Sequence, residues 1–174
     1  PNCGKLFVAP GNAGTHEIAI NLAIGITDFE GIKQAVLANS VGMVIVGPED
    51  PLVNGIHDFF LADAQLQGIT VVGPQQAAAT LEGSKEFAKE FMKAHNIPTA
   101  QYASFTAETV EEGCRFLETM KSPYVLKADG LAAGKGVYIC ENKNQAREAI
   151  KEIFDGKFGF ANNVLIEEFL KGEE

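Results

Sequence analysis

Apolar and polar positions divide the first half of the chain into short strands and amphipathic helices. Compact runs rich in valine and isoleucine predict strands over residues 6–9, 43–46 and 69–72. Apolar stripes of helical period predict helices over residues 28–39 and from Pro51 to about residue 67. This alternation is typical of βα units on a parallel sheet. The loops PGNAGT, GPEDP and GPQQ follow the strands, at the edge where such sheets bind ligands.

The pattern changes after Gly73. Helices are predicted over residues 75–81, 84–96, 106–120 and 144–154. Strands are predicted over residues 101–105, 124–128, 137–140 and 164–169. This order predicts an α+β region with a small antiparallel sheet. We therefore place a domain boundary at residue 80, giving domains 1–80 and 81–174.

Composition narrows the function classes. Hydrophobic residues make up 46% and charged residues 21% of the chain, which is typical of a folded soluble protein. The formal net charge of −9 argues against nucleic acid as a partner, and no apolar run is long enough to span a membrane. The three cysteines and three histidines lack metal-ligand spacing. We expect a cytoplasmic protein with reduced thiols.

The most informative segment is VLKADGLAAGKGVYI, residues 125–139. Its glycines and alanines let backbone N–H groups approach an anion closely, and Lys127 and Lys135 flank or occupy the loop. The spacing differs from a Walker A loop, and Gly136 stands where that motif needs Ser or Thr. Because β-branched residues follow, we predict a strand–loop–strand flap over phosphates. The alternative is a hairpin that binds nothing.

Two weaker signals accompany the flap. The segment IEEFLKGEE, residues 166–174, ends a predicted strand with carboxylates that could meet a purine edge and ribose hydroxyls, or could simply be solvated. The segment GPEDPLVNG, residues 47–55, is either a ligand loop or an ordinary turn before a helix. Neither decides the function alone.

Six blocks occur in order along the chain: VAPGNAGT, VGPEDPLVNGI, LEGSKEFAKEFM, NIPTAQY, VLKADGLAAGKGV and VLIEEFLKGEE. Together they resemble the phosphoribosylamine–glycine ligase (glycinamide ribonucleotide synthetase) family of ATP-grasp enzymes over nearly the whole chain. The resemblance implies an incomplete doubly wound, Rossmann-like α/β sheet in residues 1–80, without its first strand and helix. It implies the α+β first lobe of an ATP-grasp domain in residues 81–174, without the second lobe.

The resemblance also implies a reaction. ATP drives the joining of glycine to 5-phosphoribosylamine through an acyl phosphate, which gives glycinamide ribonucleotide, ADP and phosphate in purine synthesis. Positioning and charge neutralisation carry such chemistry, so no catalytic acid or base is predicted. ATP and Mg²⁺ are the implied cofactors, with the Mg²⁺ ligands expected beyond residue 174. The implied partners are small molecules, and the full-length enzyme is expected to be a monomer.

Site residues follow from the matching blocks. The resemblance implies nucleotide contacts by Lys85, Lys127, Gly130, Ala133, Gly134, Lys135 and Gly136. It implies an adenine hinge at Glu167, Glu168, Phe169 and Leu170, with ribose held by Glu174 or Glu173. It implies phosphoribosylamine contacts by Gly11, Asn12, Gly14, Thr15, Pro48, Glu49 and Asp50.

Other interpretations stay open. The chain could come from another ATP-grasp carboxylate–amine ligase, could be a nucleotide-binding piece without catalysis, or could be a structural module. Its ends, Pro1 and Glu174, are typical of cuts through a larger protein. We therefore expect the chain alone to turn over no substrate.

Overall fold

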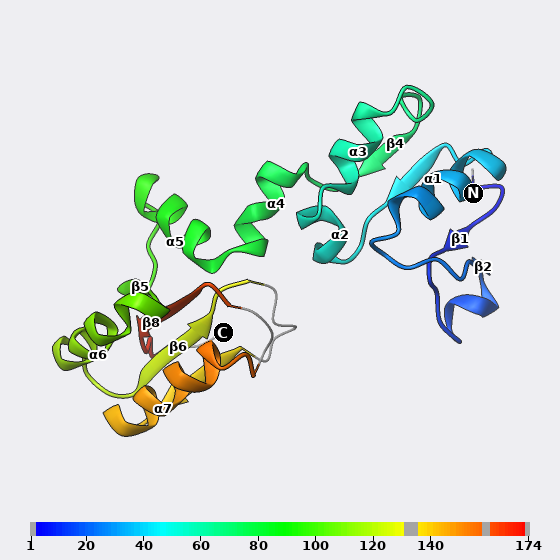
Figure 1. Cartoon of the computed structure of the whole chain (residues 1–174). Coiled ribbons are helices and arrows are strands. Elements are labelled where there is room, and N and C mark those ends of the chain that lie inside the picture. Colours follow the sequence, from blue (N-terminus) through cyan, green and yellow to red (C-terminus); the bar gives the residue numbers. More distant parts are fainter. Residues whose placement is uncertain (1–2, 131–135, 158–160, 173–174) are drawn as a thin grey trace. The chain divides into compact units, whose positions relative to one another are not determined.

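The computed structural model describes residues 3–130, 136–157 and 161–172 (Figure 1). The chain forms two compact units, Pro1–Ala79 and Thr80–Glu174. The division falls within helix α4 (Gln76–Gly83). None of the helices in the described residues is long and apolar enough to cross a membrane.

The amino-terminal unit contains two parallel strand pairs. Strand β1 (Phe7–Val8) pairs with β2 (Ile20–Asn21), and β3 (Met43–Ile45) pairs with β4 (Thr70–Val72). The parallel α/β character predicted from the sequence is confirmed, but the strands lie in two separate pairs within the described residues. Strand β2 was not predicted, because a two-residue strand is too short to show a period.

The helices of this unit begin and end at local signals. Helix α1 (Phe29–Ala38) is capped by Asp28, whose Oδ1 accepts a hydrogen bond from the Gly31 N–H at 2.9 Å. The single helix predicted from Pro51 to about residue 67 is wrong. The chain instead forms α2 (Glu49–Val53) and α3 (Ile56–Ala62), because Gly55 between them has a φ of 87° that interrupts helical geometry.

Buried apolar side chains of α1, α2, α3 and α4, and one from the segment after α3, form the core of this unit. Its members are Val36, Leu52, Ile56, Phe60, Leu66 and Ala79. The unit also contains a 3₁₀ turn, Thr15–Glu17, between β1 and β2.

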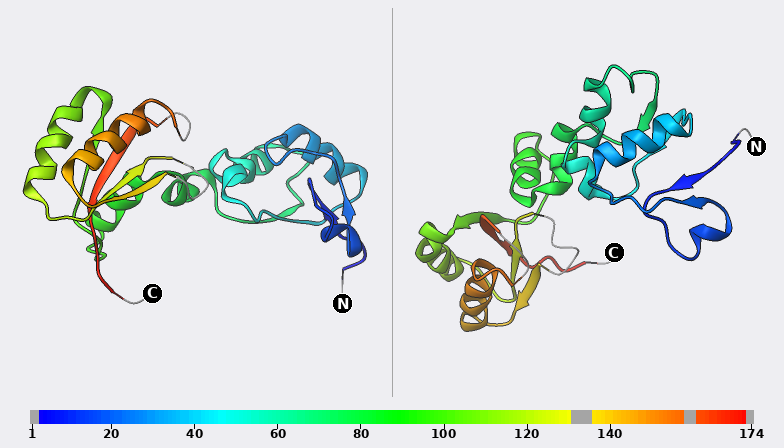
Figure 2. Two further views of the ribbon diagram at one scale, coloured as in Figure 1. Left: turned by 90° about the horizontal axis from the view of Figure 1, so that it is seen from below. Right: turned by 45° about the vertical axis from the view of Figure 1, so that its right-hand side comes forward.

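The carboxy-terminal unit is an α+β region, as predicted. Its helices are α5 (Lys85–Ala94), α6 (Val110–Thr119) and α7 (Lys143–Phe154), with a 3₁₀ turn at Ala107–Thr109. Its strands are β5 (Tyr102–Thr106), β6 (Tyr124–Ala128), β7 (Val137–Cys140) and β8 (Asn163–Glu168). They form one antiparallel sheet in the order β5-β8-β6-β7, and α7 lies along β6 and β7 (Figure 2).

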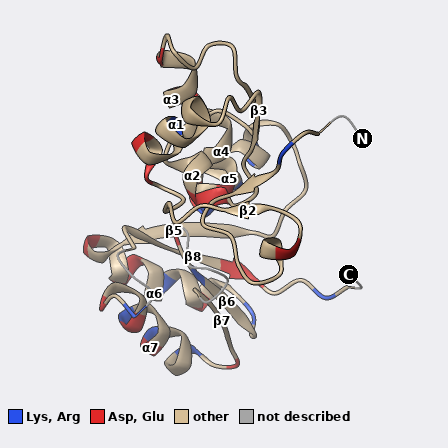
Figure 3. Ribbon diagram, turned by 90° about the vertical axis from the view of Figure 1, so that its right-hand side faces the viewer, with Lys and Arg blue, Asp and Glu red and all other residues tan. Residues whose placement is uncertain are grey.

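The two faces of this sheet differ in kind. On one face, which we call the covered face, α6 and α7 pack against apolar side chains of the strands. These strand residues are Phe105, Tyr124, Leu126, Ala128, Tyr138, Cys140, Val164 and Ile166. Away from the sheet, α6 and α7 carry both signs of charge (Figure 3), and Glu118 pairs with Lys143 and Arg147.

The opposite face carries the alternate residues of the same strands, because successive side chains of a strand point to opposite faces. Strand register places these residues together: Tyr102, Val125, Lys127, Val137, Ile139, Leu165 and Glu167. We call this the site face. Helix α5 approaches it through Lys89, which pairs with Glu167.

Candidate functional site

Two lysines share one buried carboxylate on the site face. The Nζ atoms of Lys89 and Lys127 each lie 3.0 Å from Oε2 of Glu167. Strand register explains the second pair, since Glu167 lies opposite Val125 and Lys127 is two residues further along the same face. The Glu167 side chain is 4% exposed and that of Lys127 is 29% exposed. Lys127 is therefore the member of the cluster that solvent or a ligand reaches.

Lys89 is anchored from several sides. Its Nζ donates to Oγ1 of Thr99 at 2.8 Å and lies 5.5 Å from the centre of the Tyr102 ring. The Tyr102 hydroxyl in turn donates to Oε1 of Glu90 at 2.6 Å. Burial, together with this hydrogen bond, raises the pKa of Tyr102 to about 12. Through Lys89 and Glu90, α5 thus makes polar contacts with β5 and β8.

The amino terminus of α5 meets the end of β6 at Asp129. The Asp129 carboxylate accepts from the Ser84 hydroxyl, from the Lys85 N–H at 2.7 Å and from the Glu86 N–H at 3.3 Å. A carboxylate here satisfies helix N–H groups and complements the positive end of the helix dipole. These contacts fix α5 beside the glycine-rich connection that starts at Gly130.

Lys85 lies at the start of that connection. Its Nζ donates to the carbonyl oxygen of Gly130 at 2.7 Å. Partial burial lowers the pKa of Lys85, and the nearby charge of Lys127 acts in the same direction, while Asp129 and Glu167 oppose the shift. A partly desolvated ammonium attracts an anion more strongly than one in bulk water. Lys85 and Lys127 are therefore suited to a polyanion.

Only part of the predicted flap lies in the described residues. Gly130, with a φ of 95°, and Gly136, whose carbonyl accepts from the Ala128 N–H at 2.8 Å, border it at the ends of two antiparallel strands. The strand–loop–strand prediction is consistent with that pairing. The predicted contacts that fall outside the described residues are Ala133, Gly134, Lys135, Glu173 and Glu174.

The predicted adenine hinge contains side chains with different surroundings. Glu167 is buried between two lysines, and one of its oxygens, Oε1, is buried without a hydrogen-bond partner in the described residues. Glu168 Oε1 accepts from the Gln101 N–H at 2.9 Å and so holds the start of β5. Phe169 and Leu170 are 38% and 63% exposed. Of these four residues, the last two present accessible apolar side chains.

The PGNAGT loop folds around a compact hydrogen-bond network. The Thr15 N–H donates to Asn12 Oδ1 at 3.0 Å, and Asn21 Nδ2 donates to the Asn12 carbonyl at 2.7 Å. Gly11 has a φ of 76°. Gly14 precedes the 3₁₀ turn. The loop is thus held by its own Asn12–Thr15 bond and by Asn21 of β2, with Asn12 and Gly14 exposed at its surface.

The GPEDP segment starts helix α2. Pro48 is the residue before the helix and is exposed, while Glu49 and Asp50 lie in its first turn and are half-buried. The Oδ1 atom of Asp50 accepts from Asn54 Nδ2 at 3.0 Å. This carboxylate is engaged within its own helix, and Glu49 is the other acidic side chain of the segment.

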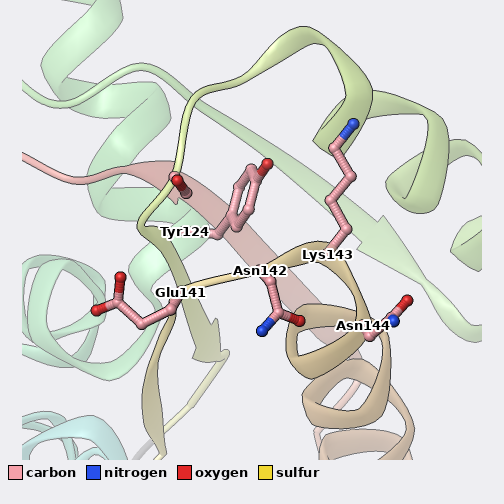
Figure 4. Close-up of a pocket in the computed structure, with 6 residues that line it drawn as sticks. Tyr124, Glu141, Asn142, Lys143 and Asn144 are labelled. Atoms are coloured by element: carbon pink, nitrogen blue, oxygen red, sulfur yellow. The ribbon is translucent and has the colours of Figure 1, made fainter.

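Within the described residues, the site face carries no metal cluster. No three His, Cys, Asp or Glu side chains there could hold a metal ion together. One hollow is lined by Tyr124, by Asn142 to Asn144 and by neighbouring side chains (Figure 4). Tyr124 begins β6, at the opposite end of the strand from Gly130, and belongs to the covered face. This hollow is separate from the lysine cluster.

Sequence reasoning missed two residues of the site. Lys89 follows Lys85 by four positions on a helix, a spacing that places both on one side, and this is the signal that could have found it. Asp129 lies inside the glycine-rich block, but its partners at Ser84 and Lys85 are distant in sequence, so no local pattern indicates the contact.

Solved structures first define the class of fold. A phosphoribosylamine–glycine ligase from Thermotoga maritima superimposes with a TM-score of 0.73 at 32% identity, over 97% of this chain and 39% of that one. An ATP-bound carboxyaminoimidazole ribonucleotide synthase from Aspergillus clavatus gives a TM-score of 0.66 at 18% identity, over 95% of this chain and 40% of that one. The chain therefore has the architecture of ATP-grasp ligases.

Family models then narrow the class. Residues 1–82 match the N domain of phosphoribosylglycinamide synthetase, and residues 83–174 match its ATP-grasp (A) domain. A phosphoribosylamine–glycine ligase of Pasteurella multocida is 49% identical over 178 aligned residues. The alignment takes in 100% of this chain and 40% of that relative, so the chain spans less than half the length of its relatives. The chain belongs to the phosphoribosylglycinamide synthetase family.

Proposed function

We propose that this chain forms the nucleotide-phosphate side of a phosphoribosylamine–glycine ligase. The reaction joins glycine to 5-phosphoribosylamine and converts ATP to ADP and phosphate, as a step of purine synthesis. The observation that carries the proposal is the convergence of Lys85 and Lys127 at the border of the glycine-rich connection. The family match and the lysines' partial exposure support it.

The described residues supply charge and position in this proposal. ATP supplies the phosphoryl group that activates the glycine carboxylate. Lys127 and Lys85 would neutralise phosphate oxygens, each with a charge-assisted hydrogen bond of about 1.5–3 kcal/mol. Gly130 and Gly136 have no side chains, so the backbone groups at these two positions can approach the phosphates closely. Phe169 and Leu170 offer exposed apolar surface for the purine ring.

Other parts of the proposal rest on sequence expectations. Gly11, Asn12, Gly14 and Thr15 would face phosphoribosylamine, and the ordered Asn12–Thr15 turn is suited to present backbone groups to a phosphate. Mg²⁺ would be held by residues beyond 174. The enzyme is proposed to work in the cytoplasm as a monomer.

The test uses the longest natural polypeptide that contains this sequence. It receives Mg-ATP, phosphoribosylamine and one carboxylic acid at a time, and ADP release is followed. Glycine-dependent release is expected, with glycine omitted as the blank. Turnover with D-alanine or another acid, but not glycine, would contradict the purine assignment and leave an ATP-grasp ligase of different specificity.

A second measurement isolates the nucleotide site. This chain is titrated with ATP, and Lys127→Ala is titrated in parallel. Binding that weakens by about tenfold or more in the variant supports the phosphate contact. Equal affinities would contradict it. If this chain binds ATP and the natural polypeptide releases no ADP with any acid, a nucleotide-binding module without catalysis becomes the better description.

A further inference from the structure

The Glu167 carboxylate has two lysine partners where one would balance its charge. Both ammonium groups lie 3.0 Å from the same oxygen, Oε2. With all three groups ionised, the cluster has one net positive charge. Exposure is graded across it, from Glu167 at 4% and Lys89 at 10% to Lys127 at 29%. The surplus charge is thus presented at Lys127.

The Lys89 side chain is less accessible to a ligand than that of Lys127. Lys89 is a buried residue of α5, with Thr99 and the face of Tyr102 as its other partners. Both of those are uncharged, so Glu167 supplies the ion pair of Lys89 within the described residues. A buried lysine is placed here against a single carboxylate. A direct role in ligand contact does not explain that arrangement.

We infer that Lys89 is a positioning residue that holds Glu167 from the interior and thereby frees Lys127 to bind phosphate. This inference rests on the proposed function. If Glu167 were paired with Lys127 alone, moving the Lys127 ammonium toward an anion would leave a buried carboxylate unpaired, which is strongly unfavourable. With Lys89 in place, Glu167 keeps a partner when Lys127 shifts. Lys89 thus lowers the cost of ligand binding without touching the ligand.

The second oxygen of Glu167 strengthens the argument. Oε1 is buried and has no hydrogen-bond partner among the described residues. The carboxylate is therefore oriented through Oε2 alone, by the two lysines. Removal of Lys89 would leave the orientation of the carboxylate to Lys127, the more exposed partner. Both charge balance and orientation depend on Lys89.

The test compares Lys89→Met with Lys89→Arg in the natural polypeptide that contains this sequence. Lys93→Met is the matched control, because Lys93 is exposed on the same helix. Steady-state assays give the KM for ATP, the KM for glycine and kcat. In Lys89→Met the KM for ATP should rise about tenfold while the KM for glycine stays within about twofold, a selectivity expected of lost electrostatic positioning. Lys89→Arg should recover most of the ATP affinity.

A merely structural role gives a different pattern. It would lower the melting temperature and the active fraction, and hence kcat, without a selective change in the KM for ATP. That result in Lys89→Met would overturn the inference. If Lys89→Met does not fold, Lys89→Arg is compared with the unmodified enzyme. A KM for ATP equal to the unmodified value, with an unchanged pH profile, supports a need for the positive charge at this position. A tenfold rise in the KM for ATP contradicts it.

A double-mutant cycle tests the route through Glu167. On a Glu167→Gln background, Lys89→Met should change the KM for ATP by less than about twofold, because the group that it positions has lost its charge. Independent, multiplying effects would overturn the inference while the proposed function stands. Absence of ATP-dependent turnover in the unmodified polypeptide, with every acid supplied, would overturn both.

Discussion

The two faces of the four-stranded sheet use the same strands for opposite purposes. On the covered face, Leu126 and Ile166 are fully buried against α6 and α7. On the site face, the next residues along, Lys127 and Glu167, form a charged cluster with a partly exposed end. Because successive side chains of a strand point to opposite faces, a core residue and a residue of the candidate site are direct neighbours in the sequence. Stability and ligand binding should therefore respond to different residues of the same strand.

The strongest test of this separation is Leu126→Ala on the covered face. Removing a fully buried leucine side chain should lower the free energy of unfolding by about 2–5 kcal/mol, from lost burial and a residual cavity. Denaturant unfolding measures this loss. ATP affinity of the folded fraction should stay within about twofold of the unmodified chain. A parallel loss of affinity in folded protein would mean that the two faces are coupled.

Lys127→Met makes the reciprocal change one residue away. ATP affinity should fall by about ten- to one-hundredfold, because one charge-assisted hydrogen bond to phosphate is lost. The free energy of unfolding should change by less than about 1 kcal/mol, since the side chain is partly exposed and Glu167 keeps Lys89 as a partner. Titration calorimetry and denaturant unfolding measure the two effects.

Lys121→Met is the matched control for that variant, because Lys121 is exposed and lies just before the same strand. It should leave ATP affinity unchanged. Equal losses in both variants would indicate a general effect of net charge rather than a contact by Lys127.

Gly113→Val tests how closely the covered face is packed. A Cβ at Gly113 would lie 3.1 Å from Cγ of Phe105 and 3.5 Å from Cδ1 of Ile166. The valine methyl groups would force these side chains apart, at a cost of about 1–3 kcal/mol in the free energy of unfolding. Gly113→Ala is the control, since its better helix propensity offsets part of the close contact. A valine variant as stable as the alanine variant would contradict close packing here.

The sequence predicted the carboxy-terminal unit more accurately than the amino-terminal one. Strands β6 and β7 have the predicted bounds, because dense apolar runs and a glycine-rich connection mark both ends. The predicted helix after Pro51 failed at Gly55, where a single left-handed residue divides the helix. A glycine inside an otherwise helical pattern does not by itself say whether the helix continues or ends.

The sequence predicted individual residues of the candidate site but not the contacts between them. Lys127 precedes a loop without bulky side chains, so the sequence indicates it directly, whereas Lys85 was predicted only from the family resemblance of its SKEF block. Their tertiary partners, Asp129 for the start of α5 and Lys89 for Glu167, are joined across separate elements. No local period reports such contacts. The side chain of Glu167, expected at the adenine hinge, therefore lies in surroundings that only the fold reveals.

The smallest expected effect is a pH dependence that belongs to the site face. The folded pKa of Tyr102 is about 12, raised from the ordinary value of 10.0 by burial first and by its hydrogen bond to Glu90 second. Because the unfolded chain loses this proton first, Tyr102 contributes stability that is present below pH 10 and is lost as the pH rises toward 12. Lys89 and Glu86 also lie near the ring or hydroxyl, and they remain in the variant Tyr102→Phe. Unfolding free energies of both proteins, measured from pH 9 to pH 12, should therefore converge as the pH rises.

Leu126→Ala is the control for that series, because a cavity on the covered face has no proton to lose. Its deficit relative to the unmodified chain should stay constant over the same pH range, and general deprotonation of lysines cancels in each difference. A Tyr102→Phe difference that stays constant as well would show that the hydroxyl ionises alike in the folded and unfolded chains. The site face would then lack the desolvated, hydrogen-bonded tyrosine on which α5 is held against β5, and the contrast between the faces would be limited to the lysine–glutamate cluster.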